Sequence, residues 1–217
     1  MSHLSPTVSV LMAVYNTPLP LIQRAVHSVL RQDFKHFELL ILDDGSRPAL
    51  SSQIQSVCLA MDDRVRYFRH ENQGQSLSIN RGVELSKGAY ISIIDSDDEY
   101  KPNHLTTCLS AMKNADLVAT STETIVTSNE DFFVPDRFDT SQNIHVDDCI
   151  LFATLFGKKE VFASIPFKQM YAADSHFFDE VVAAHFRTKK LNSRTYVYYR
   201  NIPTSTTAQL KKQQITL

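Results

Sequence analysis

Glycine is scarce in this chain, and its scarcity limits how a phosphate could be bound. There are five glycines among 217 residues, whereas globular proteins contain about 7% glycine. Their spacing forms neither a G-x-G-x-x-G turn nor a Walker A loop. A nucleotide phosphate bound here must therefore be held by something other than a glycine-rich cradle.

Cysteine, net charge and long apolar runs are also limited. The three cysteines, Cys58, Cys108 and Cys149, lie far apart without a C-x-x-C pair, which is typical of reduced, mostly buried thiols in the cytoplasm. A net charge of -2 argues against non-specific binding to nucleic acid. No apolar stretch approaches the roughly 18 residues that a membrane span needs.

Residues 1–7 are polar and lack the apolar core of a signal peptide. We therefore expect a cytoplasmic protein, either free or associated with the inner face of the membrane. A hydrophobic fraction of 43% and a charged fraction of 21% are typical of a soluble globular domain, and the length predicts one domain.

Strand and helix patterns alternate over the first 120 residues. β-branched and apolar runs predict strands at 8–14, 37–42, 65–68, 90–94 and 116–120. Helical spacing of apolar residues predicts a helix after each of the first four, with Thr17 as a cap and Pro48 and Pro102 at helix starts. This order predicts an α/β fold, a mostly parallel sheet with helices on both faces.

The second half of the chain is less regular. Residues 128–148 are polar, acidic and aromatic without a clear period, and we expect a long loop. Residues 149–156 fit a helix or a strand equally well. A helix is predicted at 174–187, a strand at 195–200, and a frayed end over the last ten residues.

Carboxylates follow two of the predicted strands. Asp43 and Asp44 end the second strand, and Asp95, Asp97 and Asp98 follow the strand at 90–94. Ligands of open parallel sheets bind beyond the carboxyl ends of the strands, where these charges would repel one another unless a cation lay between them. The sequence therefore indicates a Mg²⁺ or Mn²⁺ site. The alternative for each residue is a turn former or helix cap.

Five motifs in order carry a family resemblance over about residues 7–120: VSVLMAVYN, HSVLRQDF, FELLILDDGS, ENQGQSLSINRGVELSKG and AYISIIDSDDEYKP. They resemble the family 2 glycosyltransferases, which are inverting, depend on a nucleotide-sugar and have the GT-A fold. The resemblance implies that Asp97 coordinates a metal bridging the donor diphosphate and that Asp95 contacts the ribose. It implies donor-binding roles for Val14, Tyr15, Asn16, Asp44, Asn72, Gly74, Asn80 and Ser96, with Asp44 accepting from the ring N–H of the base. Ile79 stands where the family often has a basic residue.

The inverting reaction needs a carboxylate that accepts the proton of the acceptor hydroxyl. The resemblance implies Asp174 for this role, although Ala173 precedes it where an acidic residue is usual. A helix cap is the structural alternative for Asp174, and Asp179 and Glu180 are lesser candidates. His176 could contact the metal or the phosphate, or have only a structural role.

Arg200 could pair with the diphosphate or form an ordinary surface ion pair. The aromatic residues of the second half, Phe138 among them, could stack on an acceptor sugar or belong to the core.

We therefore expect one GT-A domain over residues 1–217, with a donor half at 7–120, an acceptor half at 121–205 and a tail at 206–217. The expected activity is metal-dependent transfer of a sugar, from a UDP-sugar in the first place, to a hydroxyl of a glycan or lipid-linked saccharide, as in cell-surface polysaccharide synthesis. A nucleotidyltransferase would need a basic, glycine-rich loop where Tyr15 to Pro18 stand. A non-catalytic module that binds a nucleotide-sugar or a partner chain remains the alternative.

Overall fold

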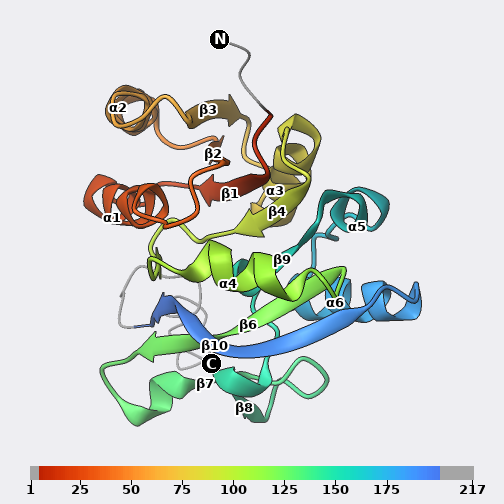
Figure 1. Ribbon diagram of the computed structural model, residues 1–217. Coiled ribbons are helices and arrows are strands. Elements are labelled where there is room, and N and C mark those ends of the chain that lie inside the picture. Colours follow the sequence, from red (N-terminus) through yellow and green to blue (C-terminus); the bar gives the residue numbers. More distant parts are fainter. Residues whose placement is uncertain (1–4, 201–217) are drawn as a thin grey trace.

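An eight-stranded sheet runs through the whole protein in the computed structural model, which describes residues 5–200 (Figure 1). Its strand order is β3-β2-β1-β4-β9-β6-β10-β5. The strands are β1 (Val8–Val14), β2 (Phe37–Asp44), β3 (Val65–His70), β4 (Tyr90–Ile93), β5 (Glu99–Tyr100), β6 (Leu117–Ile125), β9 (Leu155–Lys158) and β10 (Thr188–Tyr199). The frayed end and the tail expected from the sequence lie outside the described residues.

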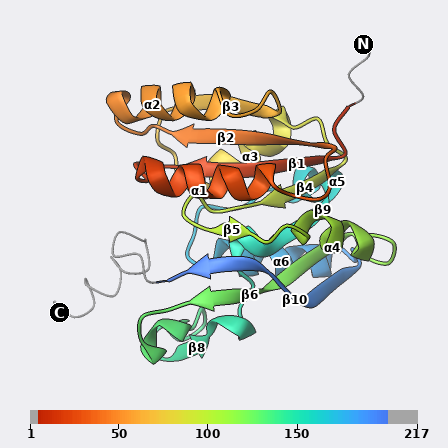
Figure 2. The same cartoon turned by 60° about the vertical axis from the view of Figure 1, so that its left-hand side comes forward.

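Most strands of this sheet point the same way. β1 is parallel to β2 and β4, β2 to β3, and β10 to β6. β9 is antiparallel to both β4 and β6, and β5 is antiparallel to β10. The carboxyl ends of the parallel strands therefore meet at one edge of the sheet (Figure 2), and the prediction of a mostly parallel sheet is confirmed.

Helices cover both faces, as predicted. One face of the sheet carries α1 (Leu19–Leu30), α2 (Pro48–Leu59) and α4 (His104–Ala111). The other face carries α3 (Gln75–Leu85), α5 (Lys159–Ser164) and α6 (Ala173–Ala183) (Figures 1 and 2). The apolar stripe of α1 faces the sheet, with Ile22, Val26 and Val29 fully buried. β2 is buried along its whole length, as expected for a strand covered on both sides.

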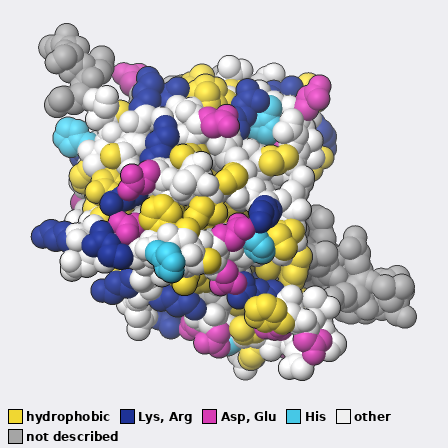
Figure 3. All heavy atoms as spheres, turned by 90° about the vertical axis from the view of Figure 1, so that its right-hand side faces the viewer, with side chains coloured by type: hydrophobic (Ala, Val, Ile, Leu, Met, Phe, Trp, Pro, Cys, Tyr) yellow, Lys and Arg dark blue, Asp and Glu magenta, His cyan; other side chains and the backbone are white. Residues whose placement is uncertain are grey.

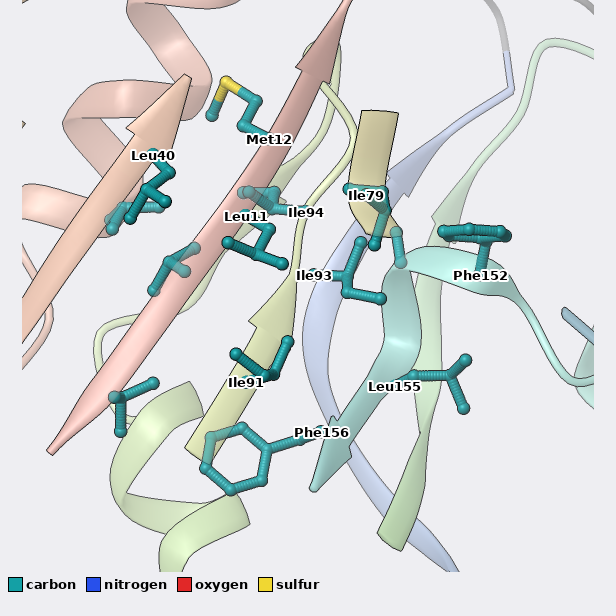
Figure 4. Close-up of a cluster of buried hydrophobic side chains, with 14 of the residues drawn as sticks. Leu11, Met12, Leu40, Ile79, Ile91, Ile93, Ile94, Phe152, Leu155 and Phe156 are labelled. Atoms are coloured by element: carbon teal, nitrogen blue, oxygen red, sulfur yellow. The ribbon is translucent and has the colours of Figure 1, made fainter. Parts of the chain in front are cut away.

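The hydrophobic core extends across the antiparallel junction between β4 and β9. Figure 4 shows side chains of β1, β2, β4 and β9 in one cluster, with Ile79 of α3 and Phe152 at its border. Because Ile79 is fully buried in this core, a basic side chain at that position would lose its hydration. Two of the cysteines, Cys58 and Cys108, are buried, Cys149 is half-buried, and all three are free thiols, as predicted.

Several sequence predictions were wrong in detail. Thr17 does not cap α1, whose N-cap is Pro18; its hydroxyl lies 2.8 Å from that of Ser96 instead. The helix predicted at 174–187 ends at Ala183, where His185 adopts a left-handed backbone with φ 63°. The helix predicted from Pro102 begins at His104.

The segment predicted as one long loop contains a small antiparallel hairpin. It pairs β7 (Phe133–Pro135) with β8 (Asn143–His145), and 3-10 turns lie at Asn129–Phe132 and Val146–Asp148. Strands of three residues are too short to produce a readable period. The undecided segment 149–156 forms a 3-10 turn at Phe152–Thr154 followed by β9.

The last strand is longer than predicted. β10 begins at Thr188 rather than at 195, and its register shifts between Leu191 and Tyr196, where Arg194 has φ 45°. Its first half is polar, and the bulge breaks the alternation of side chains, so no apolar pattern marks it.

The surface shows no dominant charge on the face drawn in Figure 3. There, basic, acidic and hydrophobic side chains of the described residues are intermingled. Among the helices of residues 5–200, none is both long and apolar enough to cross a membrane.

Candidate active site

A cavity of about 890 Å³ opens at the carboxyl edge of the sheet. One side, here called the sheet edge, consists of residues that end or follow strands: Val14, Tyr15, Asp44 and 95–98. The opposite side, here called the loop wall, consists of cavity-lining residues within 134–154 and 169–179. The β-sheet register explains the first grouping, because Val14 is paired with Asp43 in β1 and β2.

Asp95 and Asp97 place two half-buried carboxylates together at the sheet edge. Burial, and then the charge of Asp97, raise the pKa of Asp95 to about 7, against a hydrogen bond from Gln75 Nε2 at 2.7 Å. Burial also raises the pKa of Asp97, against its own backbone N–H and the charge of Arg24. These raised pKa values mean that the ionised carboxylates lack sufficient positive charge around them.

A divalent cation fits this donor set. Among residues 5–200, no three His, Cys, Asp or Glu side chains are grouped so as to hold a metal alone. Mg²⁺ and Mn²⁺ are commonly held by one or two carboxylates, with water and substrate phosphate completing the shell. The cavity offers carboxylate oxygens with little positive charge around them. A metal bound together with a diphosphate is therefore compatible with Asp97 and its surroundings.

Asp44 is oriented by the loop that follows β3. Its carboxylate accepts hydrogen bonds from the backbone N–H groups of Gln73 (2.7 Å) and Gly74 (2.9 Å), and from Asn72 Nδ2 (3.1 Å). Gly74 has φ 89°, a left-handed conformation that favours glycine. Asn72 and Gly74 therefore hold Asp44 in place and do not themselves line the cavity.

Asp174 lies on the loop wall, in the first turn of α6. It is not the cap of this helix, because the N-cap is Ala172. Its two oxygens accept backbone N–H groups from Ser175 (2.7 Å) and Phe152 (3.0 Å). Burial raises the pKa of Asp174 above its usual value, against the lowering effect of these hydrogen bonds.

Asp174 also faces the sheet edge across the cavity. Its charge contributes to the raised pKa of Asp95, so the two carboxylates interact electrostatically. The structure thus brings together Asp44, Asp95, Asp97 and Asp174, which come from three separate parts of the sequence.

Three further predicted site residues lie away from the cavity lining. Asn80 binds the backbone of Phe167 through both side-chain atoms, at 2.9 Å each. His176 pairs with Glu180, with Nδ1 3.4 Å from Oε2. Asn16, with φ 52°, binds Ser46 and the backbone of residue 47. Contacts of these side chains with a donor or a metal remain predictions that this arrangement does not favour.

The lesser candidates are engaged in ion pairs or backbone contacts. Asp179 forms an ion pair with Arg137 at 2.7 Å, and Glu180 pairs with Lys168 at 2.5 Å. Arg200 lines the cavity, but its guanidinium donates to the carbonyl oxygens of Asp131 (2.5 Å) and Phe133 (3.3 Å). Arg200 therefore holds the segment leading into β7.

Sequence reasoning missed two residues that contact the loop of residues 95–98. Gln75 donates to Asp95 from the first turn of α3, and Arg24 of α1 donates to the carbonyl oxygen of Asp97. Gln75 directly follows Gly74, which places it at the same edge as the strand ends. Arg24 is one polar residue on an amphipathic helix, and no sequence signal distinguishes it from a solvent-exposed arginine.

Solved structures share this architecture. A mannosyltransferase from Pyrobaculum calidifontis, solved with GDP-Man and Mn²⁺, matches 98% of this chain and 61% of its own at a TM-score of 0.72 and 16% identity. TarS (residues 1–349) from S. aureus, in complex with UDP-GlcNAc, matches 94% and 60% at a TM-score of 0.68 and 16% identity. The fold of this chain is the GT-A glycosyltransferase fold.

Sequence comparison identifies the family. The model of glycosyl transferase family 2 matches residues 9–174, and the chain belongs to that family. The glycosyltransferase GlyG of Streptococcus pneumoniae is 36% identical over 118 residues, which are 53% of this chain and 38% of GlyG. The chain spans only 26% and 38% of the length of two curated relatives that it matches.

Proposed function

We propose that this chain is a metal-dependent, inverting glycosyltransferase that moves a sugar from a nucleoside diphosphate, UDP in the first place, to a hydroxyl of a saccharide. One observation carries the proposal: a single cavity brings Asp95 and Asp97 at the sheet edge to face Asp174 on the loop wall. Family membership and the shared fold support it. The acceptor would be a glycan or a lipid-linked saccharide, as in surface polysaccharide synthesis.

In the proposed donor complex, the nucleotide lies along the sheet edge. Val14 and Tyr15 contact the base, Asp44 accepts from its ring N–H, and Asp95 binds the ribose. Tyr15 is 55% exposed at the cavity, so its ring is free to stack on a base. The two structural neighbours contain a GDP-sugar and a UDP-sugar, so UDP is the part of the proposal that needs direct testing.

A divalent metal held by Asp97 would supply Lewis-acid stabilisation for the departing diphosphate. This chain's own contribution is to hold the carboxylates in a partly buried, electronegative cavity. Asp95 and Asp97 stay close despite their repulsion because the folded loop fixes them. Such a site has its highest affinity for a ligand that brings a cation with it.

Asp174 would act as general base. Its carboxylate takes the proton of the acceptor hydroxyl while that oxygen forms a bond to the anomeric carbon and the bond from this carbon to the diphosphate breaks. The attack comes from the side opposite the leaving group and inverts the anomeric centre. The backbone N–H groups of Phe152 and Ser175 fix the carboxylate for this step.

The loop wall presents apolar and aromatic side chains for the acceptor. Phe138 is 83% exposed and Tyr171 is 51% exposed, and both line the cavity. The guanidinium of Arg137 lies 4.4 Å from the ring centroid of Phe138 and pairs with Asp179 of α6. An acceptor sugar placed on these rings would be close to Asp174.

The test is thermal stability with a panel of nucleoside diphosphates and their sugars, with and without Mn²⁺. A ligand at 100 times its dissociation constant stabilises a protein by about 2.7 kcal/mol. We expect stabilisation by UDP that requires Mn²⁺ and is lost in Asp97→Ala. Asp63→Ala is the matched control, because it removes an exposed acidic side chain from the connection between α2 and β3, and it should retain the stabilisation.

Each outcome has a distinct meaning. A different nucleotide that stabilises in the same way would replace UDP and leave the rest of the proposal standing. Stabilisation by a nucleotide-sugar without release of nucleoside diphosphate over a panel of saccharide acceptors would favour the non-catalytic binding module. No stabilisation by any nucleotide would refute the donor site.

A further inference from the structure

The third carboxylate of the loop after β4, Asp98, contacts the protein rather than facing the cavity freely. Its Oδ2 accepts the hydroxyl of Tyr196 at 2.7 Å, and its Oδ1 accepts the backbone N–H of Tyr199 at 2.8 Å. Both donors belong to β10, the last strand of the described chain. Asp98 is 1% exposed, so these two hydrogen bonds engage both oxygens of a buried carboxylate.

Tyr196 connects the two ends of this loop. Its phenol oxygen donates to Asp98 and accepts the backbone N–H of Asp95 at 3.2 Å. One hydroxyl therefore fixes both the residue that starts the loop and the residue that ends it, with Asp97 between them. The partners are 98 and 101 residues apart in the sequence.

Tyr199 supports the same loop through α1. The guanidinium carbon of Arg24 lies 3.8 Å from the centroid of the Tyr199 ring, and Arg24 donates to the carbonyl oxygen of Asp97. The Tyr199 hydroxyl donates to Glu99 at 2.7 Å, and Glu99 also pairs with Arg24 at 3.4 Å. The loop is thus held by β10 directly and by β10 through Arg24.

We propose that Tyr196 and Asp98 are positioning residues, whose contact ties β10 to the loop of residues 95–98 and so sets Asp95 and Asp97 for donor and metal binding. This inference rests on the proposed function. Loss of a partner that orients a ligating carboxylate commonly lowers metal affinity about 10- to 100-fold. The donor site then depends on the last strand of the described chain, although its ligands lie within the first hundred residues.

The decisive variant is Tyr196→Phe, which removes the hydroxyl and retains the buried ring. We expect the dissociation constant of UDP in the presence of Mn²⁺, measured by calorimetry, to rise about 10-fold. In the protein without nucleotide or metal, we expect faster hydrogen exchange at the amide of Asp95, which loses its acceptor. Asp98→Asn is a second variant, because it replaces one carboxylate oxygen with an NH2 group that cannot accept a hydrogen bond, so one of the two contacts to β10 is lost and UDP binding should weaken.

Tyr67→Phe is the matched control. It removes another tyrosine–aspartate hydrogen bond, from Tyr67 to Asp43 Oδ2 at 2.5 Å, at the opposite end of the strand order. We expect it to lower stability but to leave both UDP affinity and Asp95 exchange at wild-type values. If Tyr67→Phe weakens UDP binding as much as Tyr196→Phe, the effect is one of general stability and the inference is overturned.

The inference and the proposed function fail in different ways. Wild-type UDP affinity and wild-type exchange at Asp95 in Tyr196→Phe would overturn the inference while the donor site stands. If the wild-type protein binds no nucleotide, the proposed function fails. In that case, wild-type hydrogen exchange at the amide of Asp95 in ligand-free Tyr196→Phe would also refute the positioning role of the contact between Tyr196 and the loop.

Discussion

The sheet edge and the loop wall of the cavity are built in different ways. Residues of the sheet edge end or directly follow strands whose register is continuous; Val14, for example, ends β1 opposite Asp43 of β2. The loop wall and the segment that leads into it are held by hydrogen bonds of individual side chains to distant parts of the backbone, such as those of Asn80 with Phe167 and of Asp174 with Phe152. In a parallel sheet, the backbone pairing of the strands fixes the position of the strand ends. An irregular wall depends instead on each of its side-chain contacts.

The proposed roles of the two sides follow the same boundary. The sheet edge would bind the donor and the metal, and the loop wall would supply the base and the acceptor site. Substitutions on the two sides should therefore have separable effects on binding, turnover and stability.

Asp174→Asn should give the largest effect. Replacing the proposed base with an amide removes proton acceptance, and we expect kcat to fall about 10³-fold. UDP affinity with Mn²⁺ should stay near the wild-type value, because the donor ligands lie on the sheet edge. Steady-state kinetics and calorimetry on the same protein check both values.

Asp179→Asn is the control for this prediction. Asp179 lies on the same helix and lines the cavity, yet it pairs with Arg137. A fall in kcat as large as that of Asp174→Asn would show that the base has been assigned to the wrong residue.

Acid should destabilise the protein through His104, whose Nδ1 lies 2.9 Å from Thr195 Oγ1 and joins α4 to β10. Full burial lowers its pKa to about 3, below the usual value of about 6.5. Between these values the unfolded chain binds a proton that the folded protein excludes, so stability falls as pH falls through this window. We expect a loss of roughly 3 to 5 kcal/mol from this residue.

Urea unfolding of wild type and His104→Gln across the pH window between these two pKa values isolates this contribution. The difference in the free energy of unfolding between wild type and His104→Gln should narrow or change sign as pH falls, because glutamine does not titrate. His36→Gln changes an exposed histidine and should leave the pH dependence unchanged. Parallel profiles for wild type and His104→Gln would contradict the prediction.

Asn80→Ala tests whether the loop wall depends on single contacts. The substitution leaves the N–H and C=O of Phe167 without their partner, and we expect a loss of about 2 kcal/mol in the free energy of unfolding. Asn103, whose side chain makes no capping hydrogen bond, should tolerate alanine within about 0.5 kcal/mol. Wild-type stability of Asn80→Ala with weaker UDP binding would instead support a direct donor contact.

Phe138→Ala should give the smallest effect and act on the acceptor alone. Loss of one exposed aromatic contact is worth about 1 kcal/mol, so we expect the KM of the acceptor to rise about 5-fold. The KM of the donor should not change. Leu59→Ala removes another exposed hydrophobic side chain, 41% exposed on α2, and should change neither constant.

Much of the sheet edge was predictable because its signals are local. Apolar runs marked β1, β2 and β4, and Asp44, Asp95 and Asp97 end or follow them. Parallel strands end at a common edge, so the gathering of these carboxylates could be inferred without coordinates. Contacts such as Arg24 to Asp97 could not, because the arginine resembles any polar residue on a helix.

The second half shows where local signals fail. The segment leading into β9 was left undecided between helix and strand, and the first part of β10 was missed, because short or polar strands acquire their pairing from neighbours distant in the sequence. Asn80 and His176 illustrate the same limit for predicted site residues: both were expected to contact the donor or the metal, but their side chains bind Phe167 and Glu180.

The sequence by itself determined the α/β class, the parallel order of the first half and the carboxylates at its strand ends, because hydrophobic periodicity and strand termini are local properties. Only the tertiary structure decided that Asp174 faces those carboxylates, that Asp98 is held by Tyr196, and that Asn80 supports the loop wall. Each of these contacts joins residues far apart in the chain, and its geometry arises from the packing of the whole sheet and its helices.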